Sequence, residues 1–351
     1  MKNFSIVMAI VGTVIGAGFA SGKEIAWFFS RFGVNGIWTS VLIIPLFAII
    51  FIFGLNIKNE NLTQKLGRFA PILFFLTNLI FSFAMLSASI FLLQDILYFL
   101  PKIVIVIIML ALQLLVLSKG IKGFSRVCSI LVPFLVVFLL FSSFNGIIKG
   151  ENSVLITYEL IETFSSVWFC VIYVSANFLL GYTILGKLGT NLTKKHIKVI
   201  SIISAVIIGF LISVLNLSIL SNIYSMSLSM PIFGLLSSLS PVLVKMVEVF
   251  VLFAMLTTLF ATDQALLEIV NDSKIVSKWS VIKKSLAICL LVLIGAFFNF
   301  SEIVENIYPV MGVVGLIIFV IIIIPKKSHP KLGEMEIGQN DDIDEKKNET
   351  Y

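Results

Sequence analysis

The stretch Val11-Gly-Thr-Val-Ile-Gly-Ala-Gly-Phe-Ala-Ser-Gly22 lies in the middle of the first long apolar segment of the chain. Glycines, a threonine and a serine stand where a continuous membrane helix would carry large apolar residues. A glycine inside a helix costs roughly 1 kcal/mol relative to alanine, and in lipid every freed backbone group needs a partner within the protein. The stretch therefore has a structural purpose, either close packing of helices or an opening of the helix.

Close packing would use glycines four residues apart, such as Gly12 and Gly16, to bring two helices together. The polar run from Ser21 to Glu24 favours the opened helix, because such a run is unsuited to a helix that faces lipid. In an opened helix the free amides can hold a carboxylate and the freed carbonyls can hold a cation. A nucleotide-binding glycine motif is excluded, since the stretch follows no strand.

The composition is that of an integral membrane protein. The 351 residues are 59% hydrophobic and 13% charged, with a mean hydropathy of +1.09, whereas a soluble domain is about half apolar and a quarter charged. The lipid bilayer is therefore the expected surrounding, and the net charge of +6 does not indicate a nucleic-acid partner. The three cysteines lie in separate apolar segments without metal-ligand spacing, which predicts buried structural residues.

Apolar runs of spanning length recur along the whole chain, and we expect all-α architecture with about ten transmembrane helices. The expected spans are approximately 4–30, 34–56, 69–98, 102–118, 124–148, 158–186, 197–220, 241–269, 283–300 and 304–325. A short helix over the outer face is expected in the serine-rich stretch 221–240. We expect one transporter domain, 1–325, and a disordered cytoplasmic tail, 326–351.

The basic residues support this count. Of the 25 lysines and arginines, 20 fall in segments that are cytoplasmic if both termini are inside, and Lys245 lies near the outer end of the eighth span. The outer segments hold only four, Lys23, Arg31, Lys102 and Lys149. This distribution follows the positive-inside rule and predicts a multi-pass protein of the plasma membrane with both termini in the cytoplasm.

Ten spans divide into two sets of five, about 4–148 and 158–325. An odd number of spans per set inverts the second set, which is the plan of many secondary transporters. The first and sixth spans then correspond, so we expect discontinuous helices at both places. The sixth span carries Tyr173, Ser175, Asn177 and Gly181 at its centre, and paired interruptions of this kind indicate a binding site at the membrane midplane.

Two further polar features accompany the opened span. Thr257 and Thr258 lie in the eighth span, where hydroxyl groups either bond their own helix or complete a cation site with carbonyls of the first span. Asp263 lies closer to the predicted inner surface. As an intramembrane carboxyl it is a candidate for an inner ion path or a proton acceptor, although solvation at the surface is the alternative.

The sequence carries no Ser/His/Asp set, no metal-spaced His/Cys cluster and no Walker loop. We therefore predict no enzyme activity, no cofactor and no metal other than the coupling ion, and transport driven by an ion gradient.

The motif from Gly12 to Ile25, near the start of a ten-span chain, resembles the YkvI-like putative amino-acid permeases of the amino acid–polyamine–organocation superfamily, which have the LeuT-type fold. The resemblance implies that Gly16, Ala17 and Gly18 form the opened segment, where backbone amides meet a substrate carboxylate, and we expect Ser21 to be a substrate-binding residue as well. It also implies that Tyr173, Ser175 and Asn177 complete the substrate pocket. The sodium site would consist of the Gly12 and Ile15 carbonyls and the Thr257 and Thr258 hydroxyls.

Together these observations predict a secondary transporter that imports an amino acid or similar small zwitterion with sodium by alternating access. Two alternatives stay open. Proton coupling would use Asp263, and a permease-like membrane receptor would bind the ligand without accumulating it.

Overall fold

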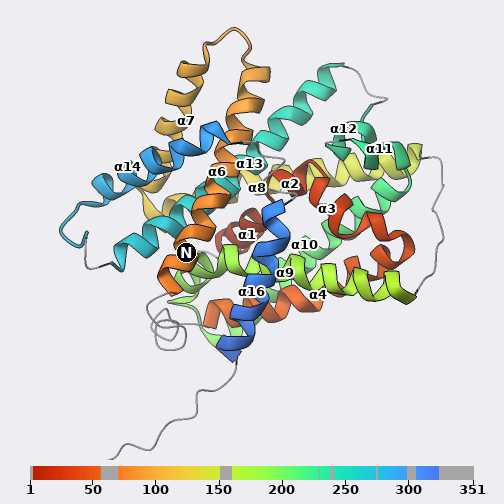
Figure 1. The fold of residues 1–351 in the computed structure, drawn as a ribbon, viewed down its shortest axis with the longest axis horizontal. Helices are drawn as coiled ribbons and strands as arrows, with labels where there is room; N and C mark the ends of the chain where they lie inside the picture. Colours follow the sequence, from red (N-terminus) through yellow and green to blue (C-terminus); the bar gives the residue numbers. More distant parts are fainter. Residues whose placement is uncertain are drawn as a thin grey trace, which may run out of the picture.

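The computed structural model describes residues 3–56, 70–150, 160–228, 230–237, 241–273, 276–298 and 306–323. Helices are the only regular secondary structure in these ranges, which confirms the predicted all-α class (Figure 1). The tail 326–351 lies outside the described residues, so its expected disorder stays a prediction.

The helices follow the expected order. The first span comprises α1 (Asn3–Val14), α2 (Ala17–Ala20) and α3 (Lys23–Phe28), and the 3-10 turn η1 (Ser30–Phe32) follows it. The second to fifth spans are α4 (Gly33–Asn56), α6 (Ala70–Ile96), α7 (Lys102–Leu117) and α8 (Gly120–Lys149). The later spans are α9 (Leu160–Gly189), α10 (Lys194–Leu220), α13 (Pro241–Asn271), α14 (Val281–Val292) with η3 (Leu293–Phe297), and α16 (Tyr308–Ile323). The stretch 221–240 holds two short helices, α11 (Ile223–Ser227) and α12 (Pro231–Leu235), instead of one.

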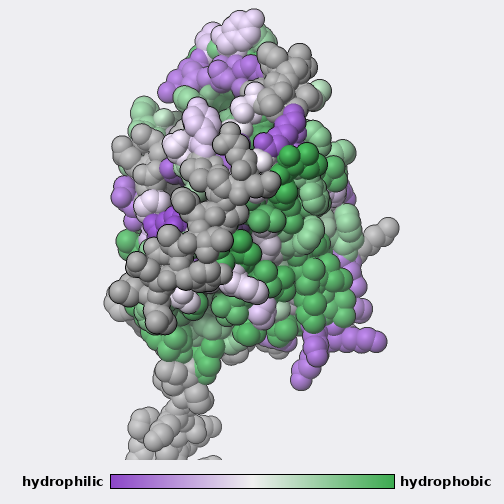
Figure 2. Space-filling model, turned by 90° about the vertical axis from the view of Figure 1, so that its right-hand side faces the viewer, coloured by the Kyte–Doolittle hydropathy of each residue, from purple (hydrophilic) through white to green (hydrophobic). Residues whose placement is uncertain are grey.

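The outer surface is that of a multi-pass membrane protein. By length and composition, six described segments can cross a membrane, namely Lys23–Asn56, Pro71–Ile96, Gly120–Lys149, Thr163–Gly189, Lys194–Leu220 and Lys245–Asn271. Three shorter apolar helices, α1, α7 and α16, add to them. Figure 2 shows a broad hydrophobic surface, with hydrophilic residues mainly at the top, on the left and at the lower right of the view. Large side chains such as Phe91 and Val137 are exposed on the described residues, as expected where lipid replaces water.

Helix α1 lies near the centre of the molecule, where it packs against α8, α9, α10 and α13 (Figure 1). Around it, α4 packs against α10, α6 against α13, and α7 against α14. These are the second and seventh, third and eighth, and fourth and ninth spans. The two predicted sets of five are therefore interleaved, although the boundaries of the repeats stay a prediction.

The expected discontinuity of the sixth span is wrong, because α9 is one uninterrupted helix from Leu160 to Gly189. The polar side chains at its centre leave the backbone hydrogen bonds of the helix in place. Asn177 Nδ2 instead donates to the carbonyl of Tyr173 one turn earlier at 2.9 Å. The segment also has no proline, and its Gly181 sits in the helix with ordinary van der Waals space around it. Nothing in this segment therefore forces the helix to open.

Candidate functional site

The first span is opened, as predicted, at Ile15 and Gly16. Helix α1 ends at Val14, and the Gly16 amide donates to the Val14 carbonyl at 2.9 Å. The Ala20 amide then donates to the Gly16 carbonyl at 2.9 Å, which closes one helical turn in α2. The expected opened segment, Gly16 to Gly18, is therefore shifted, since Ala17 and Gly18 belong to α2.

A second interruption lies at Ser21 and Gly22, where Gly22 has φ of 81°. The Ser21 hydroxyl donates to the Gly18 carbonyl at 3.1 Å and accepts from the Lys23 amide at 3.3 Å. The Ser21 carbonyl accepts from the amide of Ile232 in α12 at 2.9 Å. Ser21 therefore satisfies the backbone of the broken span. It does not line the small pocket that Thr13, Glu24 and Asn177 share.

The first break lies directly beside Thr258 of α13. The Thr258 hydroxyl donates to the Gly12 carbonyl at 3.4 Å. A Cβ added at Gly16 would lie 2.9 Å from Thr258 Oγ1, so the glycine allows this close approach. The carbonyls at the C-terminal end of α1 carry partial negative charge. The structure thus brings Gly12, Gly16 and Thr258 together at the break.

The other two residues expected at this cation site are Thr257, which lies within α13, and Ile15, which lies in the break itself. The Thr257 hydroxyl donates to the Ala254 carbonyl within its own helix at 2.9 Å, which is the alternative noted for membrane threonines. Ile15 is fully buried in the break between α1 and α2.

A small central pocket of about 10 Å³ lies where α1, α3, α6, α9, α13 and α16 meet. Its polar lining side chains are Thr13, Glu24, Asn177, Thr258 and Tyr308, and its apolar lining comes mainly from α6. A space of this size holds about one water molecule. The pocket is thus closed, and a substrate would enter only after the surrounding helices move.

Asn177 joins this pocket as predicted, and its contacts involve two tyrosines. Its Nδ2 donates to the Tyr173 carbonyl and to the Tyr308 hydroxyl, both at 2.9 Å. The Tyr173 and Tyr308 rings are nearly parallel, with centroids 6.1 Å apart. Ser175 is also buried, but its carbonyl packs against Gly315 of α16 and it does not line the pocket.

Glu24 is the functional candidate that the sequence prediction missed. Its carboxyl is buried, lines the central pocket and accepts from the Tyr173 hydroxyl at 3.2 Å. The other carboxyl oxygen lies against Gly18, where a methyl group would overlap it. The acidic residue was visible at the end of the polar run Ser21 to Glu24. Its inward direction is determined by Tyr173, which is 149 residues away.

Asp263 is a second buried carboxyl, on α13. Its side chain is fully buried, and Oδ2 accepts from Gln113 Nε2 of α7 at 2.8 Å. Next to it, the Ser82 hydroxyl of α6 donates to the Thr262 hydroxyl at 2.7 Å. The alternative of a solvated surface carboxyl is therefore wrong, because three helices enclose this residue.

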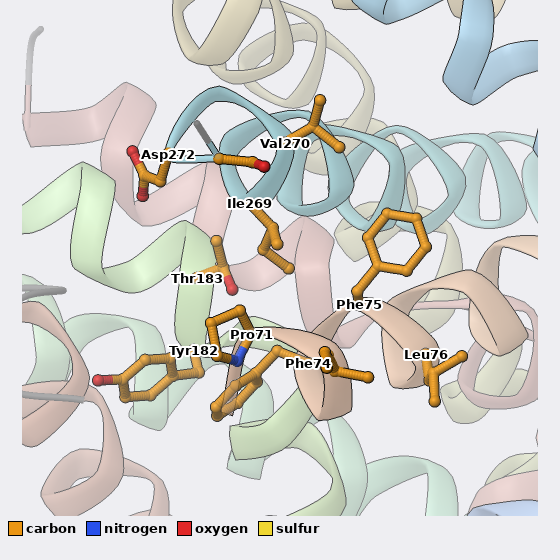
Figure 3. Close-up of a pocket in the computed structure, with 11 residues that line it drawn as sticks. Pro71, Phe74, Phe75, Leu76, Tyr182, Thr183, Ile269, Val270 and Asp272 are labelled. Carbon is orange, nitrogen blue, oxygen red and sulfur yellow. The ribbon is translucent and has the colours of Figure 1, made fainter. Parts of the chain in front are cut away.

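A larger pocket of about 490 Å³ opens at the predicted inner ends of α6, α9 and α13. Figure 3 shows its lining, with Pro71 and Phe75 on α6, Thr183 on α9 and Ile269 on α13. Tyr182 also lines it and stacks on Phe74, with ring centroids 4.9 Å apart. Along α6, α9 and α13, this pocket lies on the predicted inner side of the central pocket.

An interrupted first helix at the centre of a bundle of packed apolar helices defines the class as an all-α multi-pass membrane protein. The structure of Mhp1, a nucleobase-cation-symport-1 family transporter in a closed conformation with bromovinylhydantoin bound, matches 91% of this chain and 77% of that chain, with 15% identity and a TM-score of 0.60. The inward-facing conformation of Mhp1 matches 91% and 75%, with 11% identity and a TM-score of 0.57. No family model and no curated protein matches the sequence. The likeness establishes the fold, and the resemblance to the YkvI-like family stays a prediction.

Proposed function

We propose that this protein is a secondary transporter that moves an amino acid or similar small zwitterion together with sodium by alternating access. The observation that carries the proposal is the junction of the first break with α13, where Thr258 approaches Gly12 and Gly16. In transporters with broken helices, freed carbonyls and half-helix ends coordinate the coupling ion. The sodium ligands would be the Gly12 and Ile15 carbonyls with the Thr258 and Thr257 hydroxyls.

The two pockets support alternating access. The central pocket is enclosed, and the larger one opens on one side of it. Similar folds are known in a closed and in an inward-facing conformation, as the two Mhp1 structures illustrate. The substrate would bind at the central pocket, beside Asn177 and the break in the first span, and would leave through the larger one.

Proton coupling is a second candidate, favoured by Asp263. A carboxylate buried without a cation is costly, and the described neighbour that bonds it is the neutral Gln113. Proton binding at Asp263 would remove this cost during part of the transport cycle.

Uptake into proteoliposomes from a labelled amino-acid mixture tests the proposal. An inward sodium gradient is compared with an equal potassium gradient at constant pH. Accumulation with sodium alone supports sodium symport. Equal accumulation in both, abolished by a protonophore, would replace sodium with a proton. Binding without accumulation under either gradient would indicate a receptor.

A further inference from the structure

We infer that the central pocket recognises the protonated amino group of the substrate, and that Glu24 and Asn177 are the residues that bind it. This inference rests on the proposed transport function and adds the chemical group by which the substrate is selected.

The first ground is the state of Glu24. Its side chain is 4% exposed and lines the pocket, and its hydrogen-bond donor is the neutral Tyr173 hydroxyl. The ion pairs of the described residues involve Lys187 and Lys245 near helix ends, and none of them includes Glu24. A buried carboxylate without a cation is expensive. A cationic ligand group would neutralise it.

The second ground is independent and concerns Asn177. Both hydrogens of its amide nitrogen are used, one by the Tyr173 carbonyl and one by the Tyr308 hydroxyl. The Tyr173 carbonyl can only accept a hydrogen bond, so the Asn177 amide nitrogen, and not the amide oxygen, faces it. The amide oxygen is left buried without a partner. A buried acceptor of this kind requires a donor, and an ammonium group supplies three.

Aromatic rings complete the surroundings. Tyr308 lines the pocket and packs against Phe81, Phe28 and Tyr173, with ring centroids 5.3, 5.6 and 6.1 Å apart. Aromatic faces attract ammonium groups. Both threonine hydroxyls of the lining already donate a hydrogen bond within the protein. Thr13 donates to the Ala9 carbonyl and Thr258 to the Gly12 carbonyl. The polar groups left for a ligand are thus mainly acceptors.

This arrangement disfavours a substrate carboxylate at Gly18, where the resemblance placed it. The Glu24 carboxyl already lies against Gly18, and a second carboxylate there would meet a like charge. The pocket of about 10 Å³ admits one group of the size of water, and an ammonium group is about that size. The rest of the substrate would displace Phe81, Met85 and Leu180.

The test uses three probes on the purified full-length protein, namely alanine, ethylammonium (alanine without its carboxylate) and propionate (alanine without its amino group). Thermal unfolding is followed at fixed pH and sodium concentration. We expect ethylammonium to raise the Tm and propionate to leave it unchanged. In Glu24→Gln, ethylammonium should bind about 10- to 100-fold more weakly, since a charge-assisted hydrogen bond is lost. Glu248→Gln is the matched control, because Glu248 pairs with Lys245 away from the pocket.

Several outcomes would overturn the inference. A shift by propionate alone, no shift by ethylammonium in the unmodified protein, or an undiminished ethylammonium shift in Glu24→Gln each removes the amino-group assignment. The comparison of the two probes in the unmodified protein stands even if Glu24→Gln fails to fold. Uptake of the labelled amino-acid mixture separates the two proposals. Accumulation that ethylammonium does not inhibit leaves transport standing without this site, and ethylammonium binding without accumulation leaves the site standing without transport.

Discussion

The hydroxyl of Thr258 donates to the carbonyl of Gly12 at 3.4 Å, and so joins α13 to the end of α1 across 246 positions of sequence. This contact exists because α1 stops at Val14 and because Gly16 has no side chain to hold α13 away. It connects the sequence feature that is most unusual for a membrane helix with the proposed site of the coupling ion.

Gly16→Ala should reduce uptake at least about tenfold. The new methyl group would lie 2.9 Å from Thr258 Oγ1 and 3.4 Å from two further Thr258 atoms, and overpacking of this kind costs about 1–3 kcal/mol. The matched control is Gly181→Ala in the continuous helix α9, whose Cβ would have 3.6 Å of space. That variant should keep its uptake and raise the Tm, because alanine is the better helix former by about 1 kcal/mol. Equal loss of uptake in both variants would mean that the close approach of Thr258 to Gly16 is not what makes Gly16→Ala harmful.

Tyr308→Phe should lower the Tm by several degrees. It removes the oxygen that accepts from Asn177 Nδ2, and a buried donor left without a partner costs about 1–3 kcal/mol. Tyr98→Phe is the control, since Tyr98 is 87% exposed. Thermal unfolding of both variants in the same detergent measures the effect. An unchanged Tm in Tyr308→Phe would mean that this hydrogen bond contributes nothing to stability.

Asp263→Asn should keep sodium-driven uptake within a few-fold of the unmodified protein, because the amide oxygen of asparagine can still accept from Gln113. Under proton coupling the same variant loses concentrative uptake, since asparagine binds no proton. Uptake in a sodium gradient at constant pH distinguishes these results. Gln113→Leu should be less stable than Asp263→Asn, because it leaves the Asp263 carboxyl buried without its donor.

Cysteine labelling tests the predicted orientation. The three native cysteines, Cys128, Cys170 and Cys289, are buried, so their background reaction with a membrane-impermeant maleimide should be low. Thr190→Cys, in the exposed turn after α9, should react only in inside-out vesicles. Tyr98→Cys, in the exposed turn after α6, should react only in right-side-out vesicles. The reverse pattern would place both termini outside.

The sequence was sufficient for the features that depend on local chemistry. The glycines from Gly12 to Gly22 predicted an opened first span, and the structure uses Gly16 for the close approach of Thr258 and Gly22 for a left-handed turn. The sixth span was predicted wrongly because its polar residues resemble an interruption. Asn177 instead bonds the preceding turn and the distant Tyr308. No local pattern distinguishes a polar residue that breaks a helix from one that meets a partner on another helix.

Glu24 illustrates the same limit. In the sequence it only ends the polar run from Ser21 to Glu24 that favoured an opened helix. Its burial depends on Gly18, which leaves room for the carboxyl, and on Tyr173, which bonds it. Gly22, with its left-handed backbone at φ of 81°, sets the turn between α2 and α3 that lies between Gly18 and Glu24.

Sodium-driven uptake by Thr258→Ala tests the proposed sodium site at the break of the first span most directly. Thr258→Ser and Thr39→Val are measured beside it. Thr39 is a buried threonine whose hydroxyl donates to the Asn35 and Gly36 carbonyls of its own helix, α4. We expect that Thr258→Ala loses sodium-dependent accumulation, that Thr258→Ser retains most of it, and that Thr39→Val is unaffected. Full sodium dependence in Thr258→Ala would contradict a sodium site at the break of the first span.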